Sequence, residues 1–179
     1  LITQGRIREN HARFYVPDVA FNADGSRLAF IDTSLRIIRA DTFAEAAAIP
    51  IASGSTGVVT WQPSAVPNIP NTGLAYADGS SVRLYNTTTN TVQEFSLDEG
   101  VTAKALAFSP DGALLAALAD DSGIERAPTV PMTLNLFDVQ TGDLLLQMEV
   151  NDAWSMAFSA DGTLLALGEA NGVVIYGVE

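Results

Sequence analysis

Residues 105–116 read Ala-Leu-Ala-Phe-Ser-Pro-Asp-Gly-Ala-Leu-Leu-Ala, and this stretch decides the fold. An apolar segment is followed by an Asp-Gly pair and then by a second apolar segment. Asp-Gly between two apolar segments is a strong short-range signal for a β-hairpin, because tight hairpin turns need residues that accept positive φ. The sequence therefore predicts two antiparallel strands joined at Asp111-Gly112.

The same pattern recurs along the chain. In each copy an aromatic residue comes shortly before the Asp-Gly pair, as Phe21 before Asp24-Gly25, Phe108 before Asp111-Gly112 and Phe158 before Asp161-Gly162. A further copy lies in the gap between the first two and has Trp61 at the aromatic position, without Asp-Gly. The resulting spacing of about 40 to 50 residues is typical of four-stranded β-propeller blades.

The repeat divides the whole chain, 1–179, into four predicted blades of a single domain, at about 16–52, 53–97, 98–150 and 151–179. The first three blades each contain four predicted strands, and the last contains three. The predicted strands are 17–21, 27–31, 35–40 and 46–51; 57–61, 73–76, 82–85 and 91–95; 103–108, 113–118, 132–137 and 143–150; and 153–158, 163–167 and 173–176.

The predicted second strands are apolar at consecutive positions. Residues Ala113–Leu118 and Leu164–Leu167 do not alternate between apolar and polar side chains, as a strand with one wet face would. A buried helix is excluded for 113–118 because turn residues bound the segment too closely. Both faces of these strands must therefore be covered by neighbouring sheets.

The stretch Phe108-Ser109-Pro110-Asp111-Gly112 resembles the first hairpin of WD-repeat blades. That family usually carries Trp-Asp at the end of the third strand, where this chain has Tyr85-Asn86, Phe137-Asp138 and Tyr176-Gly177. Its opening Gly-His pair is missing here, except for His11 ahead of the first copy. The resemblance covers nearly the whole chain. It implies an all-β fold, a β-propeller of about four antiparallel four-stranded WD-type blades, but no particular function, because WD-repeat proteins serve many tasks.

Four blades leave the question of ring closure open. Residues Leu1–Asn10 are predicted to supply the missing fourth strand of the last blade, which would hide both sheet edges. An open arc would expose two apolar faces, which soluble monomers rarely do. The chain could close alone, form half of an eight-bladed ring as a homodimer, or join the remaining blades of a longer propeller. We expect one of the last two.

Composition excludes several classes of function. The net charge is −12 and the cations are scattered, so binding to nucleic acid is not expected. No apolar stretch approaches the roughly 20 residues that cross a bilayer, so membrane insertion is not expected either. The chain has no cysteine, which excludes disulfides and thiolate metal sites, and we predict neither a metal nor a cofactor. No signal peptide is visible at the start, and the composition leans toward a bacterial protein, cytoplasmic or exported.

Catalytic groups are scarce. His11 is the only histidine, so any nucleophile–histidine pair would depend on it. Carboxylate pairs of the kind used by glycosidases could come from Asp120 with Asp121, from Asp98 with Glu99, or from Asp152 beside Asn151. Acidic residues in predicted loops are usually solvated turn residues. We therefore predict that the chain is not an enzyme.

The most individual feature is an insertion at 120–131, between the second and third strands of the third blade. Such loops share one propeller face with the connections between blades, and loops carry function more often than strands do. The candidate binding face comprises Arg13, Asp98, Asp120, Asp121, Glu125, Arg126 and Asn151. We predict a non-catalytic scaffold for protein–protein interaction. The alternatives are a propeller enzyme or small-ligand or glycan-binding propeller that uses loop carboxylates, and an architectural module of a larger assembly.

Overall fold

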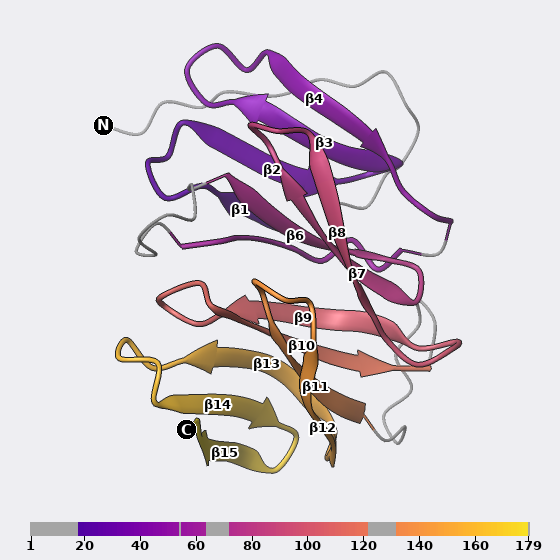
Figure 1. The fold of residues 1–179 in the computed structure, drawn as a ribbon, viewed down its shortest axis with the longest axis vertical. Helices are drawn as coiled ribbons and strands as arrows, with labels where there is room; N and C mark the ends of the chain where they lie inside the picture. Colours follow the sequence, from indigo (N-terminus) through magenta and orange to yellow (C-terminus); the bar gives the residue numbers. More distant parts are fainter. Residues whose placement is uncertain (1–17, 54, 64–71, 122–131, 179) are drawn as a thin grey trace.

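The computed structural model describes residues 18–53, 55–63, 72–121 and 132–178. Within these ranges the chain forms fifteen β-strands and no helix (Figure 1). It follows that the described residues contain no helix long and apolar enough to cross a membrane. The prediction of an all-β fold is confirmed.

The strands form four antiparallel sheets, and in each sheet consecutive strands pair as a meander. Sheet one contains β1 (Val19–Phe21), β2 (Arg27–Ile31), β3 (Ser34–Arg39) and β4 (Glu45–Pro50). Sheet two contains β5 (Val59–Trp61), β6 (Gly73–Asp78), β7 (Ser81–Asn86) and β8 (Thr91–Ser96). Sheet three contains β9 (Thr102–Phe108), β10 (Leu114–Asp120), β11 (Met132–Asp138) and β12 (Leu144–Val150). Sheet four contains β13 (Ala153–Phe158), β14 (Leu164–Glu169) and β15 (Gly172–Gly177). Every predicted strand is present, and its ends agree with the prediction to within two residues.

The Asp-Gly turns between the first and second strands are closed by their own side chains. Gly112 has a φ of 70° and Gly162 has a φ of 76°, the left-handed conformation that glycine adopts without strain. Asp111 Oδ1 accepts hydrogen bonds from Ser109 Oγ at 2.5 Å and from the Ala113 backbone N–H at 3.0 Å. The equivalent carboxylate of the last sheet, Asp161, accepts the same two kinds of bond. The aspartates therefore serve as turn anchors.

The residues that end the third strands also have equivalent roles. Asp138 Oδ1 accepts hydrogen bonds at 2.8 Å from the backbone N–H groups of Gln140 and Thr141. In sheet two, Asn86 Oδ1 accepts hydrogen bonds from the backbone N–H groups of Thr88 at 2.9 Å and Thr89 at 3.1 Å. Both side chains cap the turn that leads to the fourth strand. Asn86 and Asp138, which the sequence comparison placed at the same position of the repeat, therefore have the same role in the fold.

The four sheets are stacked in chain order, with an apolar layer between each pair of neighbours (Figure 1). The first strands lie next to one another, β1 beside β5, β5 beside β9 and β9 beside β13. Ile31, Leu35, Val59 and Tyr76 are among the residues that fill the layer between sheets one and two. Leu115 and Phe137 pack against Val82 and Phe95 between sheets two and three. Leu118, Met132, Leu165 and Leu167 lie between sheets three and four.

Specific contacts fix how neighbouring sheets sit on each other. The Trp61 Nε1–H donates a hydrogen bond of 2.9 Å to the Ala20 carbonyl, from sheet two to sheet one. Phe95 and Phe137 bring their ring centroids to 5.3 Å at an interplanar angle of 57°, a favourable tilted arrangement. These contacts orient sheet two relative to sheet one and to sheet three.

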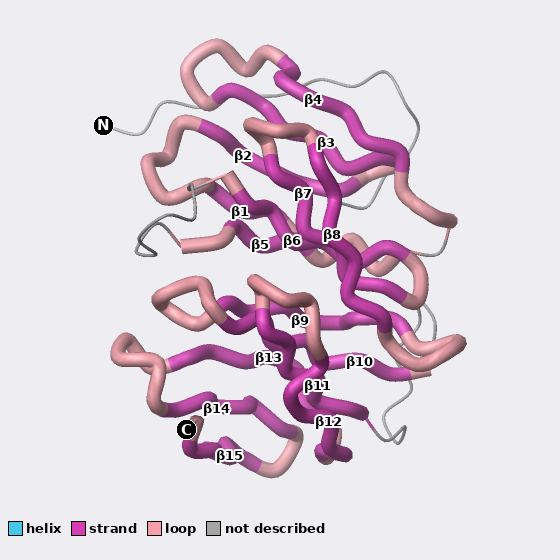
Figure 2. The backbone as a smooth tube through the Cα atoms, viewed as in Figure 1, coloured by secondary structure: helices cyan, strands magenta, loops and turns pink. Residues whose placement is uncertain are grey.

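In the part of the chain that the structure describes, the stack does not close into a ring. Sheets one and four lie at opposite ends of the molecule, and loops join the strands at both ends of every sheet (Figure 2). Sheet four has three strands in the described ranges. The closing strand predicted from Leu1–Asn10 lies outside the described residues, as do His11 and most of the insertion at 120–131.

Candidate binding face

The register of sheet three places the connections between sheets at one common end. Thr102 at the start of β9 pairs with Asp120 at the end of β10, and Met132 at the start of β11 pairs with Val150 at the end of β12. The segments that enter β9, leave β10 and leave β12 therefore share this end of the sheet. We call it the connection face.

Four of the predicted site residues belong to the described part of the connection face. Asp98, Asp121 and Asn151 are exposed there, whereas Arg13, Glu125 and Arg126 lie outside the described residues. Asp120 differs from expectation. It is the last residue of β10 rather than a loop residue, and its side chain is buried. The interpretation of Asp120 as a solvated turn residue is therefore wrong, because the strand continues two residues beyond the predicted end.

Buried carboxylates recur at the end of the second strands. Asp120 Oδ1 lies 3.2 Å from Lys104 Nζ, and both side chains are largely buried. In sheet two Asp78 Oδ2 lies 2.7 Å from a guanidinium nitrogen of Arg83. In sheet one Asp32, directly after β2, lies 2.9 Å from Arg36 Nε. Sequence reasoning missed this set, although an acidic residue follows or ends each of the four second strands: Asp32, Asp78, Asp120 and Glu169.

The carboxylates also hold the segments between sheets. Asp78 Oδ1 accepts hydrogen bonds from the Ala52 backbone N–H and, at 3.3 Å, from the Ser55 hydroxyl. Both donors belong to the connection from sheet one to sheet two. A buried carboxylate that satisfies an incoming backbone N–H fixes the path of that segment. The connection is therefore rigidly attached to the second sheet.

Asp98 is held by a different network. Gln147 Nε2 on β12 donates to Asp98 Oδ2 at 2.8 Å and to Asn135 Oδ1 at 3.1 Å. Asn135 is buried, so it anchors Gln147 in one orientation. At the next connection Asn151 Nδ2 reaches Glu169 Oε2 at 3.5 Å, the outer limit of a hydrogen bond. Asp98 and Asn151, two exposed polar residues of the connection face, are thus held by hydrogen bonds to neighbouring side chains.

Two of the turn anchors, Asp111 and Asp161, have lowered pKa values. The Ser109 hydroxyl lowers the pKa of Asp111, and the Ser159 hydroxyl lowers that of Asp161. Hydrogen bonds that the charged form accepts favour ionisation. A general acid needs the opposite, a raised pKa. These two residues lie in the turns between first and second strands, at the other end of the sheets from the connection face.

The predicted carboxylate pairs are not equivalent in their surroundings. Asp120 is buried and ion-paired while Asp121 is exposed, so the two do not share one environment. Asp98 and Glu99 are both exposed. Across the described ranges no group of three or more His, Cys, Asp or Glu side chains could hold a metal ion. The described part of this face therefore combines exposed acids with a buried, ion-paired Asp120.

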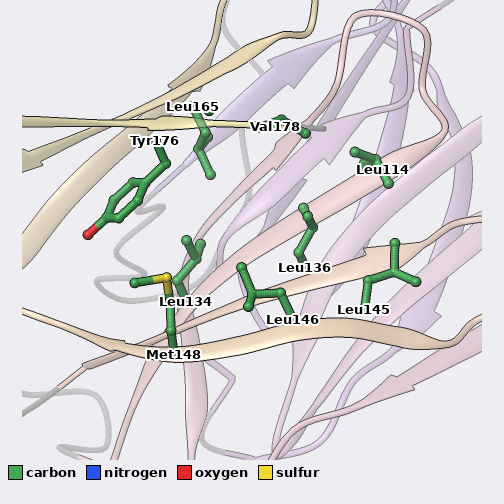
Figure 3. A pocket seen from close by; sticks show the side chains of 10 residues that line it. Leu114, Leu134, Leu136, Leu145, Leu146, Met148, Leu165, Tyr176 and Val178 are labelled. Atoms are coloured by element: carbon green, nitrogen blue, oxygen red, sulfur yellow. The ribbon is translucent and has the colours of Figure 1, made fainter.

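An apolar pocket of about 280 Å³ lies between sheets three and four, away from the connection face (Figure 3). Leu134, Leu146 and Met148 approach it from sheet three, and Leu165 and Tyr176 from sheet four. The other sheets carry a fourth strand beyond the third, whereas sheet four ends at β15 on this side in the described residues. Sequence reasoning missed the pocket, because the apolar run Leu144-Leu145-Leu146 reads as an ordinary strand.

Compared with known proteins, the chain matches no family model and no curated sequence. The WD-repeat resemblance therefore rests on the sequence pattern at Phe108–Gly112 and its copies along the chain.

Proposed function

We propose that this chain is a WD-repeat-type propeller scaffold without a catalytic role, and that its connection face binds another protein. The observation that carries the proposal is the construction of this face. Exposed Asp98, Asp121 and Asn151 share this end of the sheets with the buried carboxylates Asp78 and Asp120, which pair with Arg83 and Lys104. A surface that is oriented before binding loses little conformational freedom when a partner docks.

The propeller architecture is supported by the order of the sheets. Each sheet is a meander whose first strand lies beside the first strand of the next sheet. This is the arrangement of consecutive propeller blades, with first strands toward an axis and fourth strands at the rim. In such a ring the connection face is one of the two flat ends.

The charge of the face indicates the chemistry of its partner. The buried acids Asp78 and Asp120 each have a cationic partner, Arg83 and Lys104 respectively. The acids Asp98, Glu99 and Asp121 are exposed at this end of the sheets, on a chain with a net charge of −12. Acidic surfaces attract and orient partners of opposite charge. The partner is expected to present Arg or Lys side chains in a segment that lies across the face.

A selection of peptides displayed on phage would test this function. Peptides selected on the chain should be rich in Arg and Lys, and the double variant Asp98→Asn/Asp121→Asn should bind them about tenfold more weakly by fluorescence anisotropy. Asn preserves the acceptor that Asp98 offers to Gln147, so the change removes charge and keeps the shape.

Asp143→Asn is the matched control, because Asp143 is an exposed acid in the turn between β11 and β12, at the opposite end of sheet three. It should leave affinity unchanged. Peptides that bind the double variant as well as the parent chain, or that lose affinity with Asp143→Asn, would contradict a binding site on the connection face.

A further inference from the structure

Equivalent positions in the four sheets contact the same kind of neighbour. The aromatic residue that ends each first strand faces the preceding sheet: Trp61 belongs to the layer between sheets one and two, and Phe108 to the layer between sheets two and three. These two side chains are 7% and 8% exposed. In the described residues no sheet precedes sheet one, and the equivalent residue there, Phe21, is 60% exposed. We call this side of sheet one the front face.

The opposite side of each sheet follows the same rule. Leu35 and Val82 on the third strands of sheets one and two are fully buried against the following sheet. Their equivalent on β15 is Val173, which is 68% exposed, and its neighbour on that side, Ile175, is 62% exposed. The register supports the equivalence, because Ile175 pairs with Ala166 as Leu84 pairs with Ala75. We call this side of sheet four the rear face.

The two uncovered faces are therefore equivalent to the two faces that meet in each contact inside the chain. Each of the three apolar layers inside the chain forms where the rear of one sheet meets the front of the next. On the same side of sheet one, Phe30 on β2 and Ile38 on β3 are buried. The uncovered part of the front face therefore runs along β1. Along β1 the exposed apolar residues are Val19 and Phe21. On the rear face they are Leu164, Val173 and Ile175.

We propose that a second copy of this chain covers both faces. The front and rear faces lie at opposite ends of the stack, so one copy does not bring its own two faces together (Figure 1). Two copies related by a two-fold axis can place the rear face of each against the front face of the other. This makes the same contact twice and leaves no unfilled face, which closes a ring of eight sheets. The inference rests on the repeat register and is independent of the protein bound at the connection face.

The mass of the chain in solution tests the proposal. Light scattering behind a sizing column should give twice the chain mass of 18.9 kDa. Phe21→Asp on the front face and Ile175→Asp on the rear face should each give the single-chain mass, because each places a charge in both copies of the contact. Both positions are exposed within one chain, so cooperative thermal unfolding should persist and show that the variants fold. Val92→Asp is the control, since Val92 is exposed on β8 of the interior sheet two, and it should keep the double mass.

Mixing the two variants identifies the faces that meet. In a mixed dimer of one Phe21→Asp copy and one Ile175→Asp copy, both substitutions lie in the same contact and the other contact is unchanged. A species of double mass should therefore reappear when the two variants are mixed. A single-chain mass for the unchanged protein would overturn the proposal. So would a mass well above double, which indicates open-ended association. Retention of the double mass by Phe21→Asp would also overturn it, since pairing would then use another surface such as the edge of β15.

Discussion

Gln62 depends on the absence of a side chain at residue 73. Gln62 is buried, and its Nε2 donates a hydrogen bond of 3.0 Å to the Gly112 carbonyl in the Asp-Gly turn of sheet three. A Cβ atom on Gly73 would lie 2.3 Å from Gln62 Oε1 and 3.1 Å from Leu84 Cδ1. Gly73 therefore provides the space through which a residue of sheet two reaches the next sheet.

We predict that Gly73→Ala lowers the free energy of unfolding by about 1 to 3 kcal/mol, the usual cost of forcing extra volume into a packed interior. The backbone of Gly73 has no positive φ, so the cost comes from the side chain and not from the conformation. Urea denaturation measures the change.

Gln62→Ala is the matched partner in a double-mutant cycle. It removes the atom that the new methyl group would meet, so the double variant should lose less stability than the sum of the two single variants. Additive losses would show that the space beside Gly73 is not filled by Gln62.

At the scale of single elements, the second strands of sheets two and three each end in a buried carboxylate that forms an ion pair. The Lys104–Asp120 pair joins β9 to β10 where the two strands meet the connection face. Removing one partner of a buried pair leaves the other charge without compensation, and this costs more than the pair itself contributes.

We predict that Lys104→Met destabilises the fold by about 3 to 5 kcal/mol. The double variant Lys104→Met/Asp120→Asn should recover part of this loss, because the buried carboxylate is gone. Thermal and urea unfolding provide the measurement. Equal stability of the single and double variants would mean that the ammonium group is not what neutralises Asp120.

The strands could be predicted because each one is bounded by local signals. Asp-Gly pairs and apolar runs depend only on residues near in sequence, and the pattern of 105–116 recurs for the same physical reason in sheets one, three and four. The burial of Asp120 could not be predicted in this way. Its partner Lys104 lies on a neighbouring strand, and a strand that ends in an acid looks in sequence like one followed by an acidic loop.

Part of the candidate site was also out of reach of local reasoning. Gln147 and Asp98 are 49 residues apart in the chain and meet only because β12 lies beside the connection from sheet two. Ring closure could not be predicted either, since it depends on the angle between neighbouring sheets and not on any residue pattern. The number of sheets is encoded locally, whereas their arrangement around an axis is not.

At the scale of the whole molecule, the excess of negative charge opposes folding. The chain carries 21 acidic and nine basic residues. Three of the described basic residues, Arg36, Arg83 and Lys104, pair with buried or partly buried carboxylates, so most of the excess negative charge lies on exposed side chains. Repulsion between exposed like charges opposes folding and is screened by salt.

We predict that the melting temperature rises when sodium chloride is increased from about 10 mM to about 200 mM, over which the Debye length falls from about 30 Å to below 10 Å. The buried pairs are shielded from the ions and should contribute little to the change. Differential scanning fluorimetry at constant pH is sufficient, with choline chloride as a second salt to separate screening from specific ion effects. A melting temperature that falls with salt would mean that attractive pairs outweigh the net repulsion.

The two tryptophans of the chain stand in opposite surroundings. Trp61 is buried between sheets one and two, where its indole N–H is bonded to Ala20, whereas Trp154 on the last sheet is largely open to water. Their fluorescence therefore separates by wavelength and by access to a soluble quencher such as acrylamide. The blue component reports whether the first interior layer is intact, and the red component reports what happens at the far end of the stack. The protein thus carries two optical reporters of its own, one for folding and one for the state of its last sheet.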